Sequence, residues 1–161
     1  MVKLKKENCL QILFILSILI LLSAFIIEYV FGYQPCNLCI IERIPYGLAV
    51  IILVLNYNFR KDQIFYSILL ILVFSFSFII SIYHFGIEQG IIDESAVCAS
   101  KNLNLMTKEE VLKSLNELSI MCKDVAFRIF GLSLTTYNIL ISILMIMLST
   151  KTYLVSNDIK K

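Results

Sequence analysis

Three long stretches without charged residues constrain this chain more than any other feature of its sequence. Residues 10–27, 64–85 and 129–148 contain no Asp, Glu, Lys or Arg over 18, 22 and 20 positions. An 18-residue helix is about 27 Å long, which is close to the hydrocarbon thickness of a bilayer. Each stretch is therefore predicted to be a membrane-spanning helix.

A fourth apolar segment between the first two is weaker. Glu42 and Arg43 interrupt its start, and two asparagines interrupt its end, but residues 44–55 are apolar. We predict that it also spans the membrane, with its polar flanks at the interfaces. An even number of spans brings both termini to the same side.

The composition agrees with a membrane protein. Hydrophobic residues make up 59% of the 161 positions and charged residues 16%, which is more apolar than an ordinary soluble domain. The net charge of +2 is small and the basic residues lie in tails and loops, so a nucleic-acid partner is not expected. We predict one all-α integral membrane domain over 1–161, a four-helix transmembrane bundle in contact with the lipid bilayer. The predicted spans are 10–31, 41–57, 64–85 and 129–148, and the predicted outer loops are 32–40 and 86–128.

The N-terminal segment resembles the start of a signal peptide, since Lys3, Lys5 and Lys6 precede an apolar run. That run is longer than a typical signal-peptide core, and no small-x-small cleavage site follows it. We expect it to be retained as the first helix.

The distribution of Lys and Arg predicts the orientation. If the termini are cytoplasmic, the inner segments 1–9, 58–63 and 149–161 hold eight basic residues in 28 positions, whereas the outer segments hold six in 54. This agrees with the positive-inside rule. Both cysteine-bearing loops then lie outside.

The five cysteines follow this predicted topology. Cys36 and Cys39 fall in the first outer loop and Cys98 and Cys122 in the second, where disulfides persist, while Cys9 lies at the inner edge without a mate. Four cysteines allow three pairings. We predict pairing within each loop in the oxidised protein, and we give Cys9 no part in the chemistry.

Cys36-Asn37-Leu38-Cys39 is a Cys-x-x-Cys motif. Such a pair closes a small disulfide ring that exchanges readily with other thiols through the thiolate form. Arg43 lies four residues after Cys39, so the two share a face if a helix begins near Cys39. Pro45 requires that this helix begin just before it or be kinked there.

Other interpretations of these residues stay open. A zinc site usually offers a second close cysteine pair, whereas Cys98 and Cys122 are 24 residues apart with no His in their loop, so no metal site is predicted. A c-type haem site would need His where Ile40 stands. Inert structural disulfides remain possible, as does Arg43 acting only as an interfacial anchor.

Two further features lie around the second outer loop. A capping-box pattern at 107–110, followed by apolar residues at helical spacing, predicts a short amphipathic helix over about 108–118. His84, the single His, lies at the outer end of the third span, where an ionisable residue is a candidate for function. A His that only bonds a backbone carbonyl is the structural alternative.

Several motifs in chain order resemble the bacterial disulfide bond formation protein B family (DsbB), which are quinone-dependent thiol oxidases. These motifs are Gln34-Pro35-Cys36-Asn37-Leu38-Cys39, Glu42-Arg43-Ile44-Pro45-Tyr46, Tyr83-His84-Phe85-Gly86-Ile87-Glu88, the pair Cys98 and Cys122, and Phe130-Gly131-Leu132-Ser133-Leu134.

The resemblance implies a membrane thiol:quinone oxidoreductase in the bacterial inner membrane, with cytoplasmic termini and periplasmic cysteine loops. Its partner would be a periplasmic thioredoxin-fold dithiol oxidase (DsbA-like), and its cofactor ubiquinone or menaquinone from the respiratory quinone pool. The catalytic residues would be Cys36, Cys39, Cys98 and Cys122.

The resemblance also implies a role for each residue. Cys98 would form the mixed disulfide with the partner, and Cys122 would pass the exchange to Cys36. Cys39 would face the quinone, and Arg43 would stabilise the Cys39 thiolate and the reduced quinone. His84 would line the quinone pocket.

Two other functions remain open on the sequence. The same thiol chemistry could serve a private substrate. Alternatively, the chain could be a structural membrane subunit whose outer loops are clamped by inert disulfides.

Overall fold

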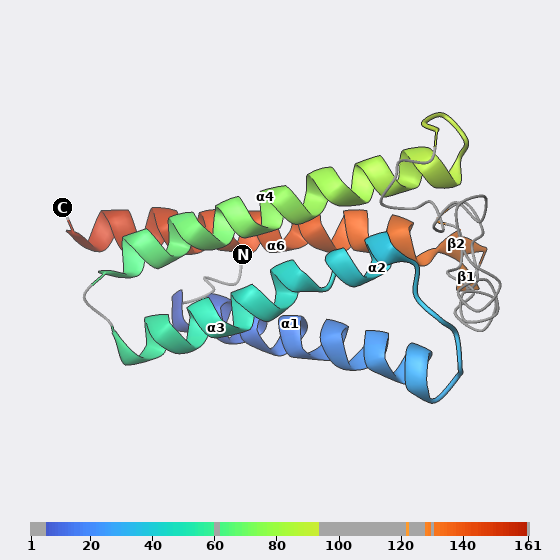
Figure 1. Ribbon diagram of the computed structural model, residues 1–161. Helices are drawn as coiled ribbons and strands as arrows, with labels where there is room; N and C mark the ends of the chain where they lie inside the picture. The colour runs from blue at the N-terminus through green and yellow to red at the C-terminus, as the bar shows by residue number, and fades with distance from the viewer. Residues whose placement is uncertain (1–5, 60–61, 94–121, 123–127, 130, 161) are drawn as a thin grey trace, which may run out of the picture.

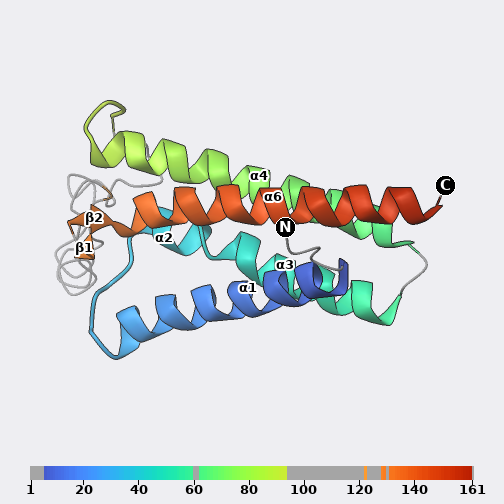
Figure 2. The same ribbon diagram turned by 180° about the vertical axis from the view of Figure 1, so that it is seen from behind.

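The computed structural model describes residues 6–59, 62–93, 122, 128–129 and 131–160. Four long helices lie side by side in a bundle (Figures 1 and 2). In chain order the elements are α1 (Lys6–Tyr29), α2 (Asn37–Ile41), α3 (Ile44–Asn58), α4 (Gln63–Glu88), β1 (Arg128–Ile129), β2 (Leu132–Ser133) and α6 (Leu134–Lys160).

The helices pack as a ring in which α1 contacts α3 and α6, while α4 contacts α3 and α6. Four segments are long and apolar enough to cross a membrane: Glu7–Tyr29, Asn37–Asn58, Gln63–Glu88 and Leu134–Asp158. The second of these combines α2 and α3. The prediction of an all-α, four-helix membrane protein is therefore confirmed.

Short α2, the two strands and the C-terminal end of α4 gather at one end of the bundle (Figure 1). The C-terminal end of α3, the start of α4 and the end of α6 lie at the other end. This arrangement brings the first cysteine motif next to the last turns of α4.

The fourth long helix begins at Leu134, whereas the predicted span started at 129. Before it, Arg128 and Ile129 pair with Ser133 and Leu132 in a two-residue antiparallel ladder. The helix also continues to Lys160, well beyond the predicted end at 148, because its polar end can leave the apolar layer. The amphipathic helix predicted over 108–118 lies outside the described residues, as does Cys98.

The second span is broken between α2 and α3. Pro45 has no backbone N–H to donate, so it fits only in a first helical turn. In the structure Arg43 caps α3 and Pro45 lies in its first turn, as expected from the sequence. The break leaves Glu42 and Arg43 between two helical segments, close to the cysteine motif at the start of α2.

The C-terminal end of α4 is closed by a tight turn. Gly90 has φ of +69°, and the N–H of Ile91 donates to the carbonyl of Gly86 at 2.9 Å, an arrangement typical of helix ends. A Cβ on Gly86 would lie 2.7 Å from Cδ1 of Ile92. Glycine at both positions therefore lets the chain fold back over the last turn, which carries Glu88.

The bundle interior combines an apolar core with small polar residues at helix contacts. Large Ile, Leu and Phe side chains point outward, where lipid can cover them, and the buried core includes Leu13, Tyr46, Ala49, Leu70, Phe74 and Met145. Between α4 and α6, Ser77 Oγ lies 3.1 Å from Ser142 Oγ, and both residues are fully buried. Small residues of this kind let transmembrane helices approach closely.

We therefore expect Ser77→Leu to destabilise the bundle. The larger side chain has no space between α4 and α6, and such overpacking costs about 1–3 kcal/mol in the free energy of unfolding. Unfolding in detergent by denaturant, followed by circular dichroism, measures the change. Ser23→Leu, at an exposed serine of α1, is the matched control and should be nearly neutral; equal effects of the two would contradict this account.

Candidate active site

The Cys-x-x-Cys motif starts α2. Cys36 is the N-cap residue, and its sulfur accepts a hydrogen bond from the backbone N–H of Cys39 at 3.3 Å. The two side chains are free thiols whose sulfurs lie 2.9 Å apart. Capping the helix thus serves a second purpose, because it holds both sulfurs on one side of the first turn.

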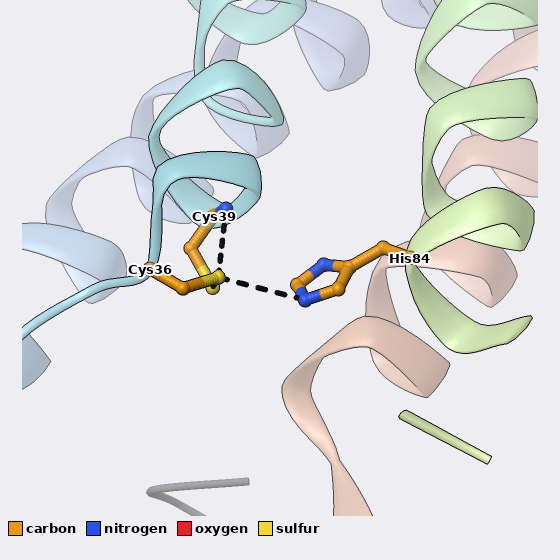
Figure 3. Close-up of side chains that lie close together, drawn as sticks. All are labelled: Cys36, Cys39 and His84. Carbon is orange, nitrogen blue, oxygen red and sulfur yellow. Dashed lines mark hydrogen bonds between the residues drawn. The ribbon is translucent and has the colours of Figure 1, made fainter. Parts of the chain in front are cut away.

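His84 of α4 points at this cysteine pair (Figure 3). Its Nε2 lies 3.5 Å from Cys36 Sγ, and the residue is 1% exposed. The hydrogen bond from the Cys39 thiol lowers the pKa of the Cys36 thiol, and the contact with His84 acts in the same direction, whereas burial opposes both. Cys36 is therefore the sulfur that the structure favours as a thiolate.

A carboxylate holds the far side of the His84 ring. Glu42, at the break between α2 and α3, places Oε1 3.1 Å from His84 Nδ1. If Nδ1–H donates to this carboxylate, Nε2 is left as an acceptor facing Cys36. The arrangement is a cysteine–histidine–carboxylate series in which Cys36 and Glu42 flank α2 and His84 comes from α4.

A second carboxylate lies on the other side of His84. Glu88 Oε1 is 3.9 Å from His84 Nε2 and accepts a hydrogen bond from Thr135 Oγ1 at 2.5 Å. The Oγ1 atom of Thr135, at the start of α6, also lies 3.4 Å from His84 Nδ1. Glu88 Oε2 has no hydrogen-bond partner among the residues that the structure describes. A buried oxygen of this kind is an acceptor available to a ligand or a proton.

Arg43 is held by α1. Its Nη1 donates to Glu28 Oε2, and its guanidinium carbon lies 5.5 Å from the centre of the Phe25 ring. The two thiols contact each other, and Cys36 contacts His84. The stabilisation of Cys39 by Arg43 stays a prediction.

A further set of polar contacts lies next to the site inside the bundle. Tyr46 OH donates to Asn138 Oδ1, and the amide of Asn138 donates to Ser81 Oγ at 2.8 Å. These contacts join α3, α4 and α6 about one turn from His84. They fix the relative position of the helices that carry the site.

Cys36, Cys39, His84 and several neighbouring residues line one cavity of about 340 Å³. Apolar side chains of α1, including Ile20, Leu21 and Ile27, form one wall. Cys36, Cys39, Glu42, Arg43, His84 and Glu88 form its polar end. A largely apolar pocket with a few convergent polar groups is typical of a small-molecule site.

Cys122 also belongs to this region. It is disulfide-bonded, buried, and part of one packed cluster with Cys36, Leu38 and Ile87. The second-loop cysteine thus lies beside the first-loop pair, as a relay between loops requires. Its predicted pairing with Cys98 stays a prediction, because Cys98 lies outside the described residues.

The structure brings five of the six predicted site residues to one end of the bundle: Cys36, Cys39, Arg43, His84 and Cys122. Glu42, which interrupts the start of the second span, and Glu88 were not predicted as site residues from the sequence. Two signals could have found them. A carboxylate inside an apolar span is a functional candidate, and Glu88 follows His84 by four residues on one helix face.

The fold and the site define a four-helix membrane protein in which a pair of cysteine thiols lines a cavity. The chain matches the family described as "Disulfide bond formation protein DsbB" over residues 6–151. It belongs to the DsbB family, as the sequence motifs indicated.

A relative from Rickettsia prowazekii (strain Madrid E), described as uncharacterized protein RP370, is 34% identical over 137 residues. The alignment covers 82% of this chain and 78% of the relative. No solved structure matches this chain.

The Glu28–Arg43 ion pair should couple α1 to the site. We expect Glu28→Ala and Arg43→Ala to show a coupling free energy of about 1 kcal/mol in a double-mutant cycle, because each removes the same contact. Denaturant unfolding in detergent of the two single variants and the double variant measures it. A coupling near zero would show that the pair does not hold α1 in place.

Proposed function

We propose that this protein is a thiol:quinone oxidoreductase of the bacterial inner membrane. It would reoxidise a periplasmic thioredoxin-fold dithiol oxidase by disulfide exchange and pass the electrons to a membrane quinone. The observation that carries the proposal is the Cys36–Cys39 pair in a cavity beside disulfide-bonded Cys122 and buried His84. Membership of the DsbB family supports it.

The cavity fits a quinone by its chemistry. Its apolar wall suits a ring with a lipid tail, and its polar end offers Arg43 and His84 to the ring oxygens. A bound quinone, ubiquinone or menaquinone, would supply the acceptor for two electrons and two protons. Arg43 would orient the ring from the α1 side, where Glu28 and Phe25 hold the guanidinium.

In the proposed exchange, each disulfide bond that breaks is replaced by one that forms, through the four cysteines of the two loops. In the proposed sequence, a thiolate of the soluble partner attacks Cys98, and Cys122 leaves as a thiolate. Cys122 then attacks Cys36 of the oxidised motif, and Cys39 leaves. A second thiolate of the partner releases Cys98, and the partner gains a disulfide. Cys98 then attacks Cys122 and frees Cys36, so the Cys98–Cys122 disulfide is restored and the Cys36–Cys39 pair holds the two electrons. The burial of Cys122 in one cluster with Cys36 supports the internal step.

His84 would handle the protons of the reduced pair. With Glu42 on Nδ1, its Nε2 can accept the proton of the Cys36 thiol. Glu88, with one oxygen unpartnered among the described residues, lies on the same ring and lines the same cavity. The chain thus provides proton acceptors next to the sulfurs inside an apolar bundle, where water is scarce.

Cys39→Ala should abolish quinone reduction, because no disulfide can then form in the motif. Purified protein with a reduced thioredoxin-fold partner and a soluble quinone measures the rate. Cys9→Ser is the matched control, since Cys9 is a free, buried cysteine near the start of α1, and it should retain the full rate. Unchanged turnover in Cys39→Ala would refute the assignment. It would favour instead a structural subunit with inert disulfides, whose thiol state would not respond to quinone depletion in alkylation gel shifts.

His84→Ala should lower turnover by about 10²- to 10⁴-fold, the range typical of a lost general acid or base. Glu42→Gln keeps the shape of the site but weakens the hold on Nδ1, so we expect a smaller loss in the same rate. Stopped-flow quinone reduction by the prereduced protein isolates this step from partner exchange. Equal rates in wild type and His84→Ala would exclude a proton-transfer role.

A further inference from the structure

The reduced cysteine pair has the arrangement of a metal site. One ligand atom from each of Cys36, Cys39 and His84 lies within 4.8 Å of the other two. Their side chains converge from α2 and α4 (Figure 3). The sulfurs are 2.9 Å apart, and a tetrahedral zinc with ~2.3 Å bonds needs about 3.8 Å between them. A small rotation of one cysteine side chain provides that difference.

The surroundings of these three ligands also suit a metal. Glu42 accepts from His84 Nδ1, which is the carboxylate–histidine contact that orients a metal-binding imidazole. Glu88 lies 3.9 Å from His84 Nε2, and its second oxygen is buried without a partner among the described residues. The donor set of two thiolates and one imidazole favours zinc over calcium or magnesium.

We propose that the dithiol form of the site binds a zinc-class divalent cation through Cys36, Cys39 and His84. Binding releases the two thiol protons and transfers no electrons. The disulfide form has no thiolates to offer, so binding is restricted to the reduced protein. A bound cation holds both sulfurs and thereby prevents them from forming the disulfide. Metal binding itself does not depend on the proposed quinone chemistry; only its inhibitory effect does.

The experiment uses Co²⁺ as a spectroscopic probe and Zn²⁺ as its competitor. The full chain carries Cys98→Ala and Cys122→Ala, since Cys122 lines the same cavity and would add a thiol after reduction. The protein is reduced in detergent, freed of reductant without oxygen, and titrated with Co²⁺. We expect one Co²⁺ per chain with thiolate-to-cobalt charge-transfer absorption, which Zn²⁺ removes. The same protein oxidised at Cys36 and Cys39 should show no such absorption.

Variants test each ligand. Cys36→Ser and Cys39→Ser should lose the charge-transfer absorption or weaken binding severely, and His84→Ala should weaken binding at least as much as Glu42→Gln. For Glu42→Gln we expect about 10- to 100-fold weaker binding, as for other groups that orient a ligand.

Cys9→Ser, at the other end of α1, should bind as tightly as the parent. Helical circular dichroism and a single elution peak confirm folding, and His84→Gln provides a second variant if His84→Ala is unstable.

The proposal is overturned if the reduced protein shows no thiolate-to-cobalt absorption. It is also overturned if Cys39→Ser or His84→Ala binds with unchanged affinity. Protection of both thiols from alkylation by Zn²⁺ gives a readout that needs no quinone. A protein that binds Zn²⁺ but never reduces quinone would refute the proposed function alone, whereas an active protein that binds no Zn²⁺ would refute only this inference.

Discussion

His84 is an ionisable side chain buried in a bundle whose outer surface is apolar, and the end of the bundle is organised around it. A polar group in such surroundings must find its partners within the protein, because unpaired burial is costly. Cys36 and Glu42, at the two ends of α2, and Thr135 of α6 provide those partners. Each partner constrains the position of the helix that carries it.

The break between α2 and α3 follows from the same requirement. A continuous helix through Pro45 would lose a backbone hydrogen bond and would carry Glu42 and Arg43 on its regular faces. The break instead leaves them free to face different neighbours, Glu42 towards α4 and Arg43 towards α1. Glu42 and Arg43, which interrupt the start of the second span in the sequence, are therefore the residues that join this span to the rest of the site.

Most of the fold could be predicted, because the sequence features that determine the helices lie within single segments of the chain. Uncharged runs long enough to cross a bilayer define the helices, and Pro45 locates the start of α3. The beginning of α6 could not be predicted, because residues 129–133 are as apolar as the helix and only pairing between β1 and β2 distinguishes them. The burial of the serines was also not predicted, since it depends on contact with a neighbouring helix that no single segment of the sequence reveals.

The sequence by itself determined the membrane class, the Cys-x-x-Cys motif and the candidates Arg43 and His84, because these depend on residue type and spacing along one segment. Only the tertiary structure decided which groups meet. It paired Arg43 with Glu28, placed His84 between Glu42 and Cys36, and brought Cys122 into one cluster with Cys36. These contacts join residues 15 to 86 positions apart in the chain. No local pattern encodes them, because they follow from which helix faces turn inward together.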